Sequence, residues 1–175
     1  MTEQHFYRSD EALCDAPILY RGAGLDGIYL CNGYERFDED GEWFTLIKDI
    51  SGLHNAIGMH LVENRKVLSP KEVRFLRLAM DVTQSELGRM LGVTSQSVAR
   101  WEKDQCEMPG PADRMLRIHF LKCLVSPEEF QEYVLAQTKR LDEMDQSSDE
   151  PMKFVHDDSQ STWKESAPDR ELEDA

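Results

Sequence analysis

The chain has 175 residues and a formal net charge of -14, and its balance of 40% hydrophobic with 31% charged residues is typical of a soluble globular protein. No apolar run approaches the roughly 18 residues that a membrane-spanning helix needs, and the N-terminus lacks the apolar segment of a signal peptide. These features exclude an integral membrane protein and predict a cytoplasmic one.

Cysteine usage and the distribution of reactive side chains argue against an enzyme. The four cysteines, Cys14, Cys31, Cys106 and Cys123, show no CxxC spacing, which favours reduced thiols over a disulfide framework or a zinc site. No nucleophile lies beside a base, and no carboxylate pair or metal-ligand set is spaced for catalysis. We therefore expect no catalytic residue, no metal and no cofactor.

Residues 1–66 predict a small strand-and-helix module. The segments 16–20, 27–31 and 43–47 are rich in β-branched and aromatic residues and are separated by turn signals, which indicates short strands in a meander. A helix should follow, because Leu53, Ile57 and Leu61 lie on one apolar stripe, with Asp49 or Ser51 available as its N-cap.

A helical domain is expected from residue 67 to residue 125. Ser69, Pro70 and Glu72 form the pattern of a capping box with proline in the first helical turn. The inward stripe of that helix contains Arg77, and an unpaired buried charge would cost several kcal/mol. Glu102 lies on the inward stripe of a later helix, so we expect the two side chains to pair.

Two short helices joined by a tight turn are predicted within the stretch 84–104. The first has an apolar stripe ending in Leu91 and should stop at Gly92, since glycine adopts a left-handed conformation without steric cost. Thr94 caps the second helix, which turns Val98 and Trp101 inward. Its opposite side carries small and polar residues with two cations, namely Ser95, Gln96, Ala99, Arg100 and Lys103.

This stretch resembles the helix-turn-helix of the Cro/CI repressor class, the XRE family. The residues that carry the resemblance are Gln84, Gly88, Gly92, Val93, Val98 and the sequence Trp101-Glu102-Lys103. It implies a recognition helix, 95–104, in the major groove of double-stranded DNA. By the same resemblance, Thr94, Ser95, Gln96 and Arg100 should face base edges, Gln84 should hold a phosphate, and Ser97 and Lys103 should touch the DNA backbone.

A second, looser resemblance concerns the N-terminal module. The sequence GLDGIYLCNG followed by ISGLHNAIG is similar to the module that precedes the repressor domain in antitoxins of the MqsA/HigA sort. The paired CxxC zinc ligands of those proteins are absent here, so the metal is not carried over. The resemblance implies a toxin protein as a partner.

The remaining segments should form two more helices and a tail. Gly110-Pro111 begins a helix with Ala112, Met115, Leu116, His119 and Cys123 inward and Arg114 and Arg117 on its flanks. A final helix, 126–145, presents Phe130, Val134 and Leu141 for dimerisation. Residues 146–175 are acidic and poor in apolar side chains, which predicts a disordered tail.

The distribution of charge is compatible with DNA binding despite the acidic total. Residues 66–125 carry ten Lys and Arg against seven Asp and Glu, whereas residues 142–175 carry three against twelve. Only the segment that contains the helix pair is basic, and phosphate contacts depend on such local charge.

The sequence thus predicts an α+β, mainly α protein with a strand-and-helix module, a five-helix Cro/CI-like domain and an acidic tail. We interpret it as a homodimeric, antitoxin-like and autoregulatory transcriptional repressor that binds a palindromic operator, cytoplasmic and nucleoid-associated when bound. The alternative is a protein-binding adaptor or toxin-neutralising partner in which DNA binding is secondary. The outer face of helix 95–104 favours the first interpretation, because an adaptor surface is more often apolar.

Overall fold

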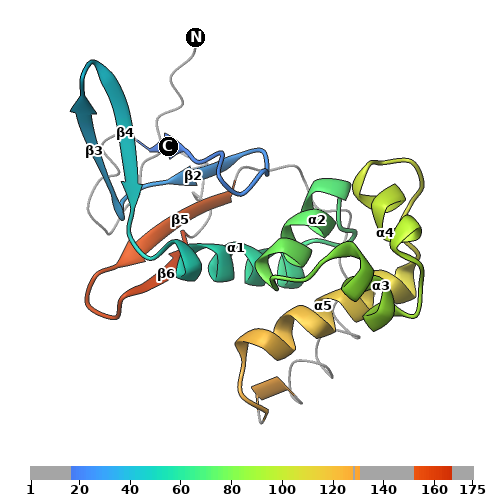
Figure 1. Cartoon of the computed structure of the whole chain (residues 1–175). Coiled ribbons are helices and arrows are strands. Elements are labelled where there is room, and N and C mark those ends of the chain that lie inside the picture. The colour runs from blue at the N-terminus through green and yellow to red at the C-terminus, as the bar shows by residue number, and fades with distance from the viewer. Residues whose placement is uncertain (1–16, 128, 131–151, 167–175) are drawn as a thin grey trace, which may run out of the picture. The chain divides into compact units, whose positions relative to one another are not determined.

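The computed structural model describes residues 17–127, 129–130 and 152–166 (Figure 1). The described part is a mixed α+β protein in which helices predominate, as the sequence predicts. It divides into two compact units. Among the described residues, the first contains 17–22, 26–56 and the C-terminal strands, and the second contains 23–25 and the chain from Ile57 to residue 130, so helix α1 (Ile50–Asn64) is shared by the two units.

The first unit is built on a four-stranded sheet with the order β1-β2-β5-β6. Strands β1 (Ile18–Leu19) and β2 (Ile28–Leu30) are antiparallel, β2 and β5 (Met152–Asp157) are parallel, and β5 and β6 (Thr162–Glu165) are antiparallel. Leu30 lies opposite Phe154 in the register, and both side chains are fully buried. The core of this unit therefore depends on strands from both ends of the chain.

The expectation of a disordered tail is wrong for residues 152–166. Met152, Phe154 and His156 are buried while the residues between them are partly exposed, which is the alternation of a half-buried strand. This segment has two lysines against three acidic residues, so most of the tail's charge lies outside it. The composition of the whole tail is acidic, and this average does not reveal a segment with nearly balanced charge that forms two strands.

Polar contacts fix the turn between β5 and β6 and the position of β6. Hydrogen bonds from the Ser159 hydroxyl and from Lys164 lower the pKa of Asp157 to about 2. The indole N–H of Trp163 donates to the carbonyls of Lys48 and Asp49, at 3.2 Å each. Trp163 thereby attaches β6 to the start of α1.

Strands β3 (Tyr34–Glu39) and β4 (Glu42–Ile47) form a separate two-stranded hairpin. Strand β4 is predicted by the sequence and β3 is not, and the predicted single meander is wrong because the hairpin does not pair with β1 or β2. Asp40 and Gly41 make the turn, both with positive φ. The hairpin is almost entirely exposed, which is why its residues lack a clear buried alternation.

Helix α1 begins as predicted, with Asp49 accepting a hydrogen bond from the Gly52 backbone N–H at 2.9 Å. In its first half, His54 Nε2 lies 2.8 Å from the hydroxyl of Tyr20. Burial raises the pKa of Tyr20 and lowers the pKa of His54, so both groups are neutral at physiological pH. The pair is a satisfied polar contact between the β1 end and α1.

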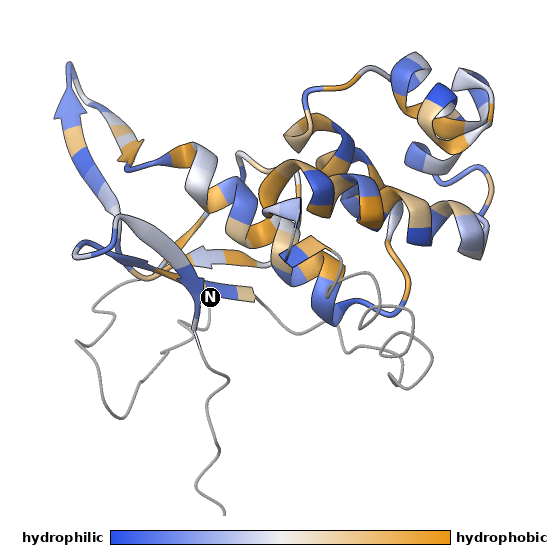
Figure 2. Cartoon of the chain, turned by 90° about the horizontal axis from the view of Figure 1, so that it is seen from below, coloured by the Kyte–Doolittle hydropathy of each residue, from blue (hydrophilic) through white to orange (hydrophobic). Residues whose placement is uncertain are grey.

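The second unit contains the remaining helices, α2 (Pro70–Ala79), α3 (Gln84–Leu91), α4 (Ser95–Glu102) and α5 (Gly110–Leu124). Their hydrophobic and hydrophilic residues alternate around each ribbon, as amphipathic helices require (Figure 2). The predicted capping box of α2 is present, with reciprocal hydrogen bonds between Ser69 and Glu72. No helix in the described part of the chain is long and apolar enough to cross a membrane.

The predicted orientation of α5 is right at Leu116 and wrong for most of the helix. Its buried stripe is Asp113, Leu116, Arg117, Phe120 and Leu121, whereas Met115 and Cys123 are exposed. The true stripe has helical spacing but includes two charged residues. A prediction from hydropathy alone therefore placed these charged residues on the solvent side of the helix.

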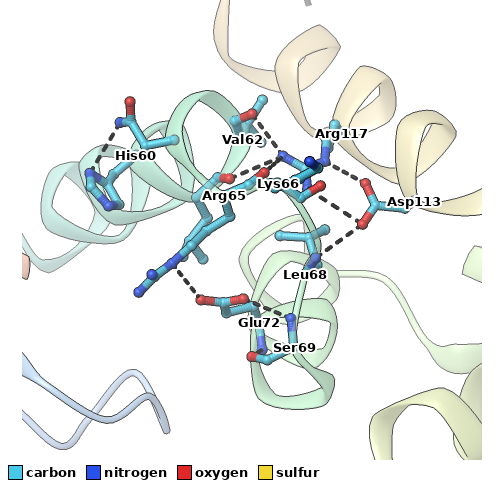
Figure 3. Close-up of polar contacts among 11 residues, drawn as sticks. His60, Val62, Arg65, Lys66, Leu68, Ser69, Glu72, Asp113 and Arg117 are labelled. Atoms are coloured by element: carbon cyan, nitrogen blue, oxygen red, sulfur yellow. Dashed lines mark hydrogen bonds and ion pairs between the residues drawn. The ribbon is translucent and has the colours of Figure 1, made fainter. Parts of the chain in front are cut away.

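Arg117 is buried to 1% exposure and connects α5 with the end of α1 (Figure 3). Its Nε donates to Asp113 at 2.5 Å, and its guanidinium also donates to four carbonyls, those of Leu61, Val62, Arg65 and Lys66. Asp113 accepts a further hydrogen bond from the backbone N–H of Leu68 at 3.1 Å. The last carbonyls of a helix have no partner within the helix, and this arginine donates to two of those of α1, at Leu61 and Val62.

The predicted final helix lies mostly outside the described residues. Its start is described except for residue 128, and Ser126 and Glu129 form reciprocal hydrogen bonds there, which lower the pKa of Glu129. Phe130 is partly exposed. Val134 and Leu141 lie outside the described residues.

Candidate nucleic-acid interface

Helix α3 is closed at both ends by local chemistry. Thr83 is its N-cap and forms a capping box with Glu86, whose carboxylate accepts from the Thr83 backbone N–H at 2.8 Å and hydroxyl at 2.7 Å. These hydrogen bonds lower the pKa of Glu86, so the box is intact at neutral pH. Gly92 ends the helix in the left-handed conformation with φ of 69°, as predicted.

The turn between α3 and α4 requires a small residue at position 88. A Cβ atom on Gly88 would lie 2.8 Å from the carbonyl oxygen of Val93 and 3.2 Å from the backbone nitrogen of Ser95. The obstacle is backbone, which cannot swing aside like a side chain. Gly88 thus lets the N-terminus of α4 approach α3 closely.

Helix α4 presents one face to the core and the other to solvent. Thr94 is its N-cap and accepts from the Ser97 backbone N–H at 3.2 Å. Val98 and Trp101 are buried, while the two cations, Arg100 and Lys103, are exposed. The helix is therefore fixed from beneath and offers a polar, cationic outer surface.

The buried ion pair that the sequence predicts is present. Arg77 donates from Nε to Glu102 Oε1 at 2.6 Å and from a terminal nitrogen to Oε2 at 3.1 Å, a two-point contact between α2 and α4. The Glu102 side chain is only 4% exposed. Arg77 also donates to the Val82 carbonyl at 2.9 Å, and Gln84 Nε2 donates to Glu102 Oε2 at 2.8 Å. This network sets the position of α4 relative to α2 and α3.

The predicted site residues come from two neighbouring elements. Those on α4 and its caps form one surface, with five residues exposed and Ser97 partly covered; the exposed ones are Thr94, Ser95, Gln96, Arg100 and Lys103. Thr94 is exposed, and its hydroxyl lies 3.1 Å from that of Ser97. Gln84 is partly buried, and one of its amide hydrogens is engaged with Glu102.

Sequence reasoning missed two parts of this site. It did not identify Thr83 as the N-cap of α3, although Thr83 and Glu86 have the S/T-x-x-E spacing of a capping box. It also gave Gln84 a role toward phosphate alone, and the structure adds a contact with the buried pair. The acidic partner of Gln84 lies 18 residues along the chain, so no local pattern indicates it.

Residues 73–107 match the family model described as Helix-turn-helix. The matched segment runs from the first half of α2 through α3 and α4 to the turn that follows. The chain carries a Cro/CI-type helix-turn-helix domain. The match covers about a fifth of the chain, and no curated protein or solved structure matches the sequence significantly.

The helix-turn-helix domain makes the protein a DNA-binding regulator of transcription. In such domains the second helix of the pair enters the major groove. Here that helix is α4, and its exposed face is the one described above. No group of three or more His, Cys, Asp or Glu side chains within the described ranges is placed to hold a metal ion.

Proposed function

We propose that the protein is a transcriptional repressor that reads a palindromic operator through the outer face of α4. The observation that carries this proposal is the exposure of Gln96 and Arg100 on a helix that is held rigidly from beneath. Val98 and Trp101 are buried under them, and the Arg77–Glu102 pair restrains the helix. Rigid support matters because base readout requires side chains at fixed positions.

Each exposed residue has a role that suits its chemistry. Gln pairs bidentately with adenine and Arg with guanine, so Gln96 and Arg100 would specify bases, assisted by Thr94 and Ser95. Ser97 and Lys103 would contact the DNA backbone. At the N-terminus of α3, the second amide hydrogen of Gln84 and the first backbone N–H groups would hold a phosphate.

A homodimer completes the proposed function. One helix pair reaches only a few base pairs, and two-fold symmetric binding doubles the recognised length. The surface for dimerisation would be the final helix, through Phe130, Val134 and Leu141. Repression would follow from occupancy of an operator that overlaps a promoter, including the protein's own.

The likeness to MqsA/HigA antitoxins supports a toxin protein as partner and an autoregulated operon as genetic context. The likeness rests on the strand-and-helix sequence of the N-terminal module alone. The adaptor alternative differs in one respect: it requires a protein-binding surface and no base-specific contact from α4.

Alanine variants on α4 test the proposal. With the DNA upstream of the protein's own gene as duplex, Gln96→Ala and Arg100→Ala should each weaken binding by about 1 to 3 kcal/mol and relax the preference at one base pair. Lys103→Ala should weaken binding to all sequences alike and reduce the salt slope by about 1, because it removes one phosphate contact. Fluorescence anisotropy with matched and mutated duplexes at two salt concentrations measures both effects.

Lys122→Ala is the matched control, since Lys122 is an exposed cation on α5 outside the proposed interface. It should leave binding within about 0.5 kcal/mol of the parent. Parental affinity in Arg100→Ala would show that α4 presents a different face to DNA. A parent that does not distinguish its upstream DNA from a random duplex would refute autoregulation and leave base reading to be tested on another operator.

A further inference from the structure

The β3–β4 hairpin exposes an apolar surface that the DNA-binding function does not use. Opposed residues of an antiparallel pair point to the same side, and alternate residues along a strand share a face. One face of the hairpin therefore carries Phe37 opposite Phe44, Glu35 opposite Leu46, and Glu39 opposite Glu42. We call these six residues the Phe face. The two strands mix hydrophobic and hydrophilic residues along their length (Figure 2).

The apolar centre of the Phe face is open to solvent. Phe37 is 46% exposed, Phe44 42% and Leu46 57%, and the two phenyl rings stack with centroids 5.7 Å apart. Contiguous exposed apolar side chains ringed by polar ones are characteristic of interaction surfaces. Within the described sheets, β3 and β4 pair only with each other, and a partner in extended conformation could add a strand to such a hairpin.

The charged residues among the six of the Phe face are all negative. Glu35, Glu39 and Glu42 surround the two rings, and Glu39 lies directly opposite Glu42 in the register. Like charges in opposed positions destabilise a strand pair. A cation bound between the two carboxylates would relieve this repulsion.

The other face of the hairpin differs in this respect. There the Arg36 guanidinium lies over the ring of Trp43, 5.4 Å from its centroid, so the exposed aromatic residue has a cation from its own chain. The Phe face has no cation of its own among its six residues. Charged residues on an exposed hairpin can serve only to prevent aggregation. That role would not explain why two stacked phenyl rings lie between them.

We propose that the Phe face is a docking surface for a basic segment of another protein, in which Lys or Arg side chains flank an apolar centre. The cations would pair with Glu35, Glu39 and Glu42 and lie against the faces of the phenyl rings. Two copies of this chain would bring six glutamates together, and DNA would bring phosphate, so charge disfavours both as occupants. The proposal is independent of α4 and of base reading.

A designed peptide provides the test with the full-length protein. The probe is a short extended peptide with threonine at every second position. The positions between the threonines are occupied by valine and lysine in turn, so that valine and lysine share one face of the peptide. Added to protein labelled with ¹⁵N, it should shift the amide resonances of residues 34–47 in a saturable manner. The matched peptide with glutamate in place of lysine should not shift them.

Two variants assign the effect to the Phe face. Phe37→Ser with Phe44→Ser should weaken binding of the lysine peptide about tenfold or more, as expected for central aromatic anchors. Leu78→Ser, which removes an exposed apolar side chain from α2, is the control and should bind as the parent does. The indole resonance of buried Trp163 reports whether the first unit stays folded in each variant.

Three outcomes would overturn the proposal. The lysine peptide could leave residues 34–47 unshifted, or the Phe variant could bind it as tightly as the parent. In the third, the resonances of 34–47 would move with protein concentration alone, which would show that a second copy covers the face. Each result is separable from the DNA-binding experiments, because none involves α4.

Discussion

Replacement of Arg117 by methionine should lower the free energy of unfolding by about 3 to 5 kcal/mol. The change leaves the buried carboxylate of Asp113 without its cation, and it removes the donor to the Leu61, Val62 and Arg65 carbonyls at the end of α1. A buried polar group without a partner retains its full desolvation penalty. Urea denaturation followed by circular dichroism measures the loss.

Lys122→Met is the matched control, because Lys122 is a cation on the same helix and exposed. It should change stability by about 0.5 kcal/mol or less. Arg117→Lys should fall between, since an ammonium cannot reproduce the fork that contacts Asp113 and the carbonyls together. A midpoint for Arg117→Met equal to that of Lys122→Met would show that the α1 end does not depend on this contact.

Replacement of Glu102 by alanine should cost a similar amount, about 3 to 5 kcal/mol, because Arg77 would remain buried without its partner. It should also weaken DNA binding, since the pair restrains α4 and Gln84 contacts the same carboxylate. Thermal and urea melts give the first effect, and anisotropy with an operator duplex gives the second. Glu107→Ala, at an exposed position just beyond α4, is the control.

The two buried ion pairs should differ in how stability changes when the arginine and its acidic partner are replaced together. Arg77→Met with Glu102→Met leaves one backbone carbonyl, that of Val82, and the Gln84 amide without their partners, so stability should largely recover. The corresponding double change at Arg117 and Asp113 leaves several carbonyls and the Leu68 N–H unsatisfied, so stability should not recover. Equal recovery in both pairs would contradict the capping role of Arg117.

The helix-turn-helix was predictable because its structure is specified locally. Ser69 with Glu72, Gly92 and Thr94 each determine a helix end through contacts within a few residues, and all three are found as expected. The Arg77–Glu102 pair was predictable for another reason. Each is the one charged residue on an apolar stripe, and burial leaves such charges few alternatives to pairing.

The parts that escaped prediction depend on distant contacts or on charge in unexpected places. Strand β5 pairs with β2 from the other end of the chain, and Asn32 and His156, which exchange hydrogen bonds there, are 124 residues apart. No local pattern can indicate such a pairing. The prediction of the orientation of α5 failed because an arginine is normally a surface residue. The carbonyls that bind Arg117 cannot be identified from the sequence.

Selection of bound DNA from a pool of random duplexes tests the central claim most directly. The full-length protein should enrich an inverted repeat whose half-sites are about 10 to 10.5 bp apart, or a multiple of that spacing, as expected for a dimer with one α4 in each major groove. The variant with Gln96→Ala and Arg100→Ala, if its melt matches the parent, should lose the enrichment at the positions these side chains read. Recovery of the same repeat by the double variant, or of no sequence at all by the parent, would contradict the proposed repressor.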